Sequence, residues 1–69
     1  MTSFDISLNG KRMATDAATL HALLQAQGYD FKNAFACSIN NTFVPRLQWP
    51  DRALHAGDRI DVITPIAGG

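Results

Sequence analysis

Few residues in this 69-residue sequence could take part in a chemical reaction: a closing Gly68-Gly69 pair, one cysteine and two histidines. Glycine lacks a Cβ atom, so a Gly-Gly segment is thin and takes backbone angles closed to other residues. We expect a terminal carboxylate on such a segment to fit through a narrow channel into a partner's active site. The alternative is that small residues gather at a terminus without any function.

The single cysteine and the two histidines favour structural roles. Cys37 lies at an inward position of an alternating segment, which predicts a small buried residue with a raised pKa and no reactivity, not a nucleophile or persulfide carrier. No carboxylate or serine is spaced to recruit His21 or His55 for acid–base chemistry, so both are predicted on the surface. One cysteine and two scattered histidines also lack the spacing of a zinc site. We predict no catalytic residue of the chain's own and no metal.

Composition indicates one small globular domain. The sequence is 46% hydrophobic and 17% charged, far from a disordered composition. Six basic and six acidic residues give zero formal net charge, which argues against nucleic acid or an anionic membrane as a partner. No apolar run is long enough for a signal peptide or a membrane span, and one cysteine allows no internal disulfide. A cytoplasmic location is therefore expected.

The N-terminal third predicts a β-hairpin followed by a helix. Residues 4–8 alternate with Phe4, Ile6 and Leu8 inward, Asn9-Gly10 supplies a type I′ turn, and residues 11–14 return with Met13 inward. A short helix follows, with Thr19 as its N-cap and Gly28 just beyond its end. Its apolar stripe is Leu20, Leu23 and Leu24, which we assign to the core.

The remainder predicts three further strands. Residues 34–39 alternate with Phe35, Cys37 and Ile39 inward, and Asn40-Asn41 forms a turn. Residues 42–46 form a short strand near whose end Pro45 removes an amide donor. Residues 48–51 are predicted as a loop with Trp49 over the rim of the core, Leu54 as a lone anchor, and residues 55–58 as a turn. The last strand is residues 59–64, with Ile60 and Val62 inward.

This order predicts an α+β fold of the ubiquitin-like β-grasp type, a small mixed sheet with one main helix packed on one face. The first and last strands pair in parallel at the sheet centre. Residues 1–65 form the domain, and residues 66–69 are expected to be a flexible tail. The sheet face away from the helix is the candidate docking surface. Ile63 is the main candidate residue on it, and Phe43 and Arg46 are further candidates.

Four stretches resemble one family, the ThiS sulfur carriers of thiamin-thiazole biosynthesis. They are Ser38-Ile39-Asn40, Val44-Pro45-Arg46 followed by Gln48-Trp49, Gly57-Asp58 and Ile66-Ala67-Gly68-Gly69. The Gly-Asp turn and the Gly-Gly end are shared with the small subunit of molybdopterin synthase, whereas Val-Pro-Arg with its tryptophan is more specific to the thiazole branch. Cys37 stands where the family commonly has an aliphatic residue.

The resemblance implies a function performed with partners. An adenylyltransferase similar to ThiF would use ATP to convert the Gly69 carboxylate to an acyl-adenylate. A persulfide donor, such as a cysteine desulfurase system, would then displace AMP to leave a thiocarboxylate, and a thiazole synthase similar to ThiG would take the sulfur. Gly69 would be the modified residue, with Gly68, Ala67 and Ile66 forming the tail, and the chain would bind no cofactor.

Elementary chemistry agrees with the need for a partner. A terminal carboxylate, with a pKa of about 3.3–3.7, is ionised and unreactive toward nucleophiles at neutral pH. The sequence has no glycine-rich phosphate loop with which to activate it. Ordering the tail costs on the order of 1–2 kcal/mol per residue, so affinity should come largely from the folded body. A carrier for molybdopterin, a protein modifier and a plain binding module remain the alternatives.

Overall fold

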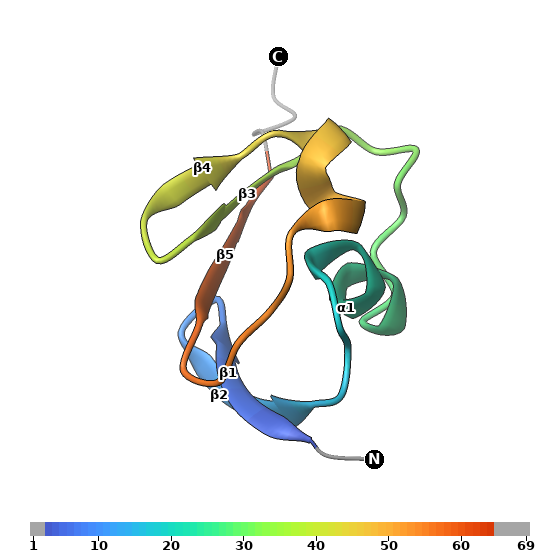
Figure 1. Cartoon of the computed structure of the whole chain (residues 1–69). Helices are drawn as coiled ribbons and strands as arrows, with labels where there is room; N and C mark the ends of the chain where they lie inside the picture. Colours follow the sequence, from blue (N-terminus) through green and yellow to red (C-terminus); the bar gives the residue numbers. More distant parts are fainter. Residues whose placement is uncertain (1–2, 65–69) are drawn as a thin grey trace.

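The computed structural model describes residues 3–64, so the predictions on Ile66, Ala67, Gly68 and Gly69 lie outside the described residues. Within that range the chain forms five strands and two helical segments (Figure 1). These are β1 (Phe4–Leu8), β2 (Lys11–Thr15), α1 (Leu20–Ala26), β3 (Ala36–Ile39), β4 (Thr42–Val44), the 3₁₀ helix η1 (Arg46–Asp51) and β5 (Arg59–Ile63).

The strands form one mixed sheet in the order β2-β1-β5-β3-β4. Strands β1 and β5 run parallel, with Leu8 opposite Ile60, and all other neighbouring pairs are antiparallel. Helix α1 and η1 lie on one face of this sheet (Figure 1). The predicted β-grasp architecture, with the first and last strands paired at the centre, is confirmed.

Both tight hairpin turns use the left-handed backbone region. Asn9 and Gly10 have φ angles of 54° and 82°, and Asn40 and Asn41 have 53° and 68°. A type I′ turn requires positive φ at both central residues, which asparagine and glycine accept more readily than other residues. The two predicted turns are therefore confirmed.

The asparagine side chains of these turns also fasten the central strand. Asn9 Oδ1 accepts a hydrogen bond from the Val62 amide at 2.8 Å, and Asn40 Oδ1 accepts one from the Arg59 amide at 3.0 Å. Thus each hairpin holds β5 through a side chain as well as through the sheet. Sequence periodicity does not reveal this second role.

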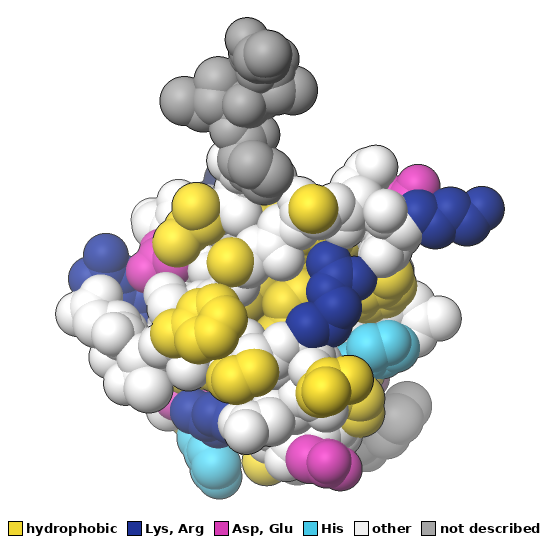
Figure 2. All heavy atoms as spheres, turned by 90° about the horizontal axis from the view of Figure 1, so that it is seen from above, with side chains coloured by type: hydrophobic (Ala, Val, Ile, Leu, Met, Phe, Trp, Pro, Cys, Tyr) yellow, Lys and Arg dark blue, Asp and Glu magenta, His cyan; other side chains and the backbone are white. Residues whose placement is uncertain are grey.

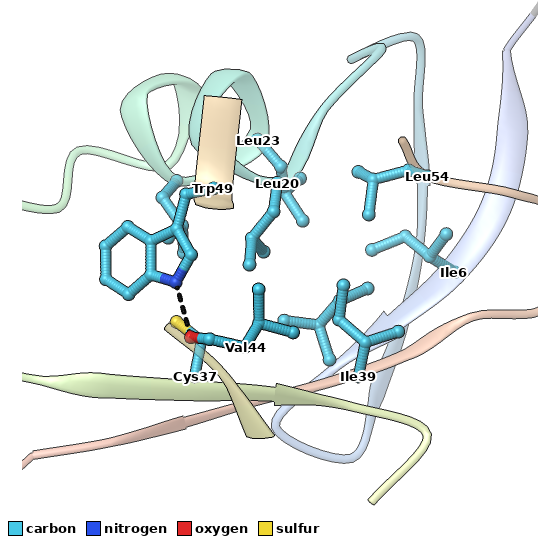
Figure 3. Close-up of a cluster of buried hydrophobic side chains, with 10 residues drawn as sticks. Ile6, Leu20, Leu23, Cys37, Ile39, Val44, Trp49 and Leu54 are labelled. Atoms are coloured by element: carbon cyan, nitrogen blue, oxygen red, sulfur yellow. Dashed lines mark hydrogen bonds between the residues drawn. The ribbon is translucent and has the colours of Figure 1, made fainter. Parts of the chain in front are cut away.

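The core lies between the sheet and the two helical segments (Figure 3). Thr19 caps α1, because its hydroxyl accepts a hydrogen bond from the Ala22 amide at 3.2 Å. Helix α1 has only seven residues, too few to be stable alone, and it is held by burial of its leucine stripe. The buried hydrophobic residues are Ile6, Leu20, Leu23, Leu24, Cys37, Ile39, Val44, Trp49, Leu54 and Ile60.

Two sequence predictions in the region after β4 are wrong. The strand expected over residues 42–46 stops at Val44, and residues 46–51 form a 3₁₀ helix where a loop was expected over 48–51. Trp49 does not lie over the core rim: its side chain is 1% exposed. Its indole Nε1 donates to the Val44 carbonyl oxygen at 2.9 Å (Figure 3), which satisfies the one polar atom that would oppose burial.

Smaller differences concern strand ends. Strand β3 begins at Ala36 and not at residue 34, and β5 ends at Ile63 and not at residue 64. The predicted inward side chains hold, since Ile60 is buried and Val62 packs against the core. Among residues 3–64, no helix combines the length and the apolar character needed to cross a membrane.

Candidate functional site

The end of β5 defines the candidate site, because the residues outside the described range continue from it. Ile63 is opposite Ala36 in the β3–β5 pair. The end of β4, the start of η1 and the segment leading into β3 lie at this same end of the molecule (Figure 1). We call this region the β5 end.

Hydrophobic side chains gather on the β5 end (Figure 2). Ile63 is 60% exposed and Phe43 is 64% exposed. Both point to the sheet face away from α1, because their neighbours Val62 and Val44 pack toward the core. Strand β3 lies between them, and their partners on it, Ala36 and Ser38, are two residues apart. Ile63 and Phe43 are therefore roughly 12 Å apart. The exposure that a docking role for Ile63 and Phe43 requires is present.

A third exposed apolar residue was not predicted. Leu47, in η1, is 92% exposed. No period in the surrounding sequence marks it, since its exposure depends on the 3₁₀ helix that turns Trp49 inward and leaves Leu47 outward. Single exposed apolar residues are ordinary on protein surfaces. Three of them among the described residues, with Ile63 three residues before Ile66, make the β5 end the candidate docking surface.

A shallow hollow of about 340 Å³ lies beside Ile63 and is lined otherwise by Ala34, Phe35 and Ala36. Another hollow, of about 490 Å³, is lined largely by β1 residues together with Arg12 and Gly57. The larger hollow is at the β1–β2 side of the sheet, away from the last residue of β5. We therefore centre the candidate site on the smaller one.

Arg46 is exposed, as a partner contact would require, but its guanidinium is already engaged within the chain. It donates from Nη1 to the Phe31 carbonyl at 2.7 Å and from Nη2 to the Asn33 carbonyl at 3.0 Å. It also lies over the Phe35 and Trp49 rings, 4.9 and 4.7 Å from their centroids. Arg46 begins η1 and does not end an edge strand, so the strand-based expectation for it is wrong.

Cys37 is buried in the core, as predicted. Burial raises the pKa of its thiol from 9.0 to about 11, although the positive charge of Arg46 acts in the opposite direction. The thiolate is the reactive form of cysteine, so this environment suppresses nucleophilic chemistry at neutral pH.

We predict that Cys37 in the folded protein reacts with iodoacetamide at pH 8 at least on the order of 100-fold more slowly than in urea. The thiol pKa is about two units higher in the folded protein than in the unfolded chain, and burial also blocks access of the reagent.

The raised pKa also predicts how stability depends on pH. Between pH 9 and 11 the thiol of the unfolded chain ionises before that of the folded protein, so the unfolded state binds fewer protons and the free energy of unfolding falls as pH rises. Alkylation followed by intact mass, and urea midpoints across this pH range, check both statements. Equal rates in the two states would contradict the burial.

The histidines occupy different environments. The His21 ring stacks on the Phe31 ring with centroids 4.6 Å apart, so it is partly covered, whereas His55 is exposed. His55 Nδ1 lies 4.0 Å from Asp58 Oδ2, a proximity that the spacing argument missed. That carboxylate already accepts from the His55 amide at 2.9 Å and from Asn40 Nδ2 at 3.1 Å, which supports its predicted role in the turn. Residues 3–64 contain no group of three or more His, Cys, Asp or Glu side chains able to hold a metal.

Comparisons with known proteins agree with this architecture. The model of the ThiS family matches residues 6–69. A crystal structure of the thiamine biosynthesis protein ThiS from Geobacter metallireducens superposes with a TM-score of 0.80 at 20% sequence identity, covering 96% of this chain and all of that one. At that identity the structural likeness shows the fold. A search of curated proteins found no match.

Proposed function

Because the chain belongs to the ThiS family of sulfur carriers, we propose that it carries sulfur as a thiocarboxylate on Gly69 and supplies it to thiazole formation in thiamin biosynthesis. The observation that carries this proposal is the extent of the family match, which continues through the Gly68-Gly69 end. The apolar β5 end, whose Ile63 is five residues before Gly68, supports it independently. A cytoplasmic location is part of the proposal.

The chemistry is divided between the chain and its partners. An adenylyltransferase transfers AMP from ATP to the Gly69 carboxylate, releasing pyrophosphate and creating the leaving group that a carboxylate lacks. The terminal sulfur of a donor persulfide then attacks the acyl carbon and displaces AMP. A thiol reduces the resulting acyl disulfide, which yields the thiocarboxylate and a disulfide. The chain is a co-substrate of these enzymes, not an enzyme, and binds no cofactor.

In this proposal the folded body supplies recognition and the tail supplies the reacting carbon. Ile63 and Phe43 form the apolar contact for the adenylyltransferase and the thiazole synthase. Exposed apolar area at such a surface contributes roughly 25 cal/mol per Å² when a partner covers it. Burial of this apolar surface against the partner therefore offsets the entropic cost of ordering a glycine-rich segment in the partner's channel.

The direct test is conversion of the purified chain. Incubation with its adenylyltransferase, ATP, a persulfide donor and a thiol should increase the intact mass by the difference between sulfur and oxygen. Fragmentation should locate that change at Gly69. Omission of ATP is the control, because no acyl-adenylate then forms. An unchanged mass with an enzyme that converts its own carrier would reject the proposal.

The pathway requires a second experiment. A strain that lacks this protein should need added thiazole for growth without thiamin, and should keep the activity of its molybdenum enzymes. Loss of molybdenum enzyme activity with normal thiamin synthesis would assign the carrier to molybdopterin instead. Stable adducts on lysines of other proteins would indicate a modifier.

A further inference from the structure

The segment between α1 and β3 forms one wall of the hollow at the β5 end. Residues 29–35 contain no helix or strand. A local turn orders part of the segment: the Asn33 amide donates to the Asp30 carbonyl at 3.0 Å, and the Lys32 amide donates to Asp30 Oδ1 at 2.9 Å. Phe35, at the end of the segment, lines the hollow together with Ile63. The position of this wall therefore depends on what holds the segment to the rest of the fold.

Arg46 provides such a link. Its two terminal nitrogens donate separately to the carbonyls of Phe31 and Asn33, two residues apart. A guanidinium is a rigid planar fork, so the two bonds fix the direction of the segment as well as its distance from η1. Hydrogen bonds with a charged donor are also stronger than neutral ones. A lysine ammonium has the charge but lacks this fork.

The same guanidinium also holds the aromatic part of the wall. It lies over the Phe35 ring at 4.9 Å and over the Trp49 ring at 4.7 Å, and the two rings stack with centroids 5.2 Å apart. Trp49 is buried and fixed by its own hydrogen bond, so it forms a rigid base for this group. Arg46 thus connects three parts of the wall: the buried Trp49 ring, the Phe35 ring and the backbone of the segment before β3.

The separation of Thr64 and Gly69 in the sequence indicates what covers the hollow. Gly69 is five residues beyond Thr64, so at 3.3–3.6 Å per residue the two lie at most about 18 Å apart. If Gly69 is the reacting residue, as proposed above, an enzyme that encloses its carboxylate must also lie against the surface from which the tail departs. Ile63, one residue before Thr64, borders the hollow. The occupant expected there is consequently an apolar side chain of the adenylyltransferase.

We propose that Arg46 is a positioning residue for this docking: it holds residues 31–35 so that the hollow beside Ile63 receives an apolar side chain of the adenylyltransferase. This inference rests on the proposed function. Arg46 acts through Phe35 and the segment backbone, not by touching the reacting carbon. The competing possibility is that Arg46 meets a carboxylate of the enzyme directly.

Arg46→Lys separates the two possibilities, because it keeps the positive charge and removes the fork. If Arg46 positions the wall, Arg46→Lys and Arg46→Ala should both raise the apparent KM for the carrier about tenfold, with kcat within about twofold of wild type. Amide exchange at Lys32 and Asn33 should become faster in both variants. Arg12→Ala, which removes an exposed arginine from β2, is the matched control and should change neither quantity.

Ile63→Asp provides the opposite control, because it damages the apolar contact without changing the hydrogen bonds of Arg46 to the Phe31 and Asn33 carbonyls. It should raise KM while leaving amide exchange at Lys32 and Asn33 as in wild type. The inference would be overturned if Arg46→Lys behaved as wild type, or if its segment exchanged faster while KM stayed unchanged. Calorimetric Kd values of the same variants for the adenylyltransferase measure docking separately from thiocarboxylate formation. If the wild-type chain binds the enzyme but forms no thiocarboxylate, the proposed function is overturned, and the Kd values of the Arg46 variants still decide the role of Arg46.

Discussion

Deletion of Gly69 should lower thiocarboxylate formation by at least about 100-fold while leaving the fold unchanged. The shortened chain still ends in a carboxylate, on Gly68, but the group stands one residue, or roughly 3.5 Å, short of its place in the adenylyltransferase. Misplacement of a reacting group by about 1 Å already costs on the order of 100-fold in rate. Initial rates from intact mass spectrometry, at saturating ATP, measure the effect.

Two controls locate the cause of that loss. The unfolding midpoint of the deleted chain should equal that of wild type, because the sheet and the core are complete within residues 3–64. Gly69→Ala keeps the carboxylate at its position and adds one methyl group, so it should retain more activity than the deletion. A deleted chain that is converted at the wild-type rate would show that the reaction takes place elsewhere on the molecule.

The features that sequence could predict are those encoded by local pattern. Alternation in residues 4–8 and 59–64, and the Asn-Gly and Asn-Asn pairs, each depend on backbone geometry that a few adjacent residues determine. The Leu20 stripe and the Thr19 cap are equally local. These elements, joined in order, were sufficient for the β-grasp prediction.

The features that sequence could not predict depend on contacts between distant segments. Arg46 reads as an exposed cation until the segment ending at Phe35 is placed beside it, 11 residues earlier in the chain. Trp49 reads as a loop residue because Pro50 follows it, yet the 3₁₀ helix that begins after Pro45 turns it into the core. The hollow at Ile63 exists only when β3 and β5 are paired. Tertiary packing, not local propensity, determines all three.

The side chain of Trp49 should be the most costly single truncation in the domain. Its burial is nearly complete, and it contacts the rings of Phe31 and Phe35 as well as the Val44 carbonyl. Replacing such a residue by alanine typically costs about 3–5 kcal/mol. Domains of this size are stable by only about 3–10 kcal/mol, at 0.05–0.15 kcal/mol per residue. Trp49→Ala should therefore leave a large fraction of molecules unfolded at 37 °C.

Urea unfolding followed by circular dichroism measures this cost, since fluorescence is lost with the indole. Trp49→Phe keeps an aromatic ring but leaves the buried Val44 carbonyl without its donor, so it should lose roughly 1–3 kcal/mol and remain folded. Leu47→Ala, in the same 3₁₀ helix but 92% exposed, should change stability by less than about 0.5 kcal/mol. The alkylation rate of Cys37 should rise from Leu47→Ala to Trp49→Phe to Trp49→Ala, in the order of their losses of stability, because unfolding exposes the core that contains Cys37. A Trp49→Ala chain as stable as Leu47→Ala would mean that the indole does not hold η1 against the sheet.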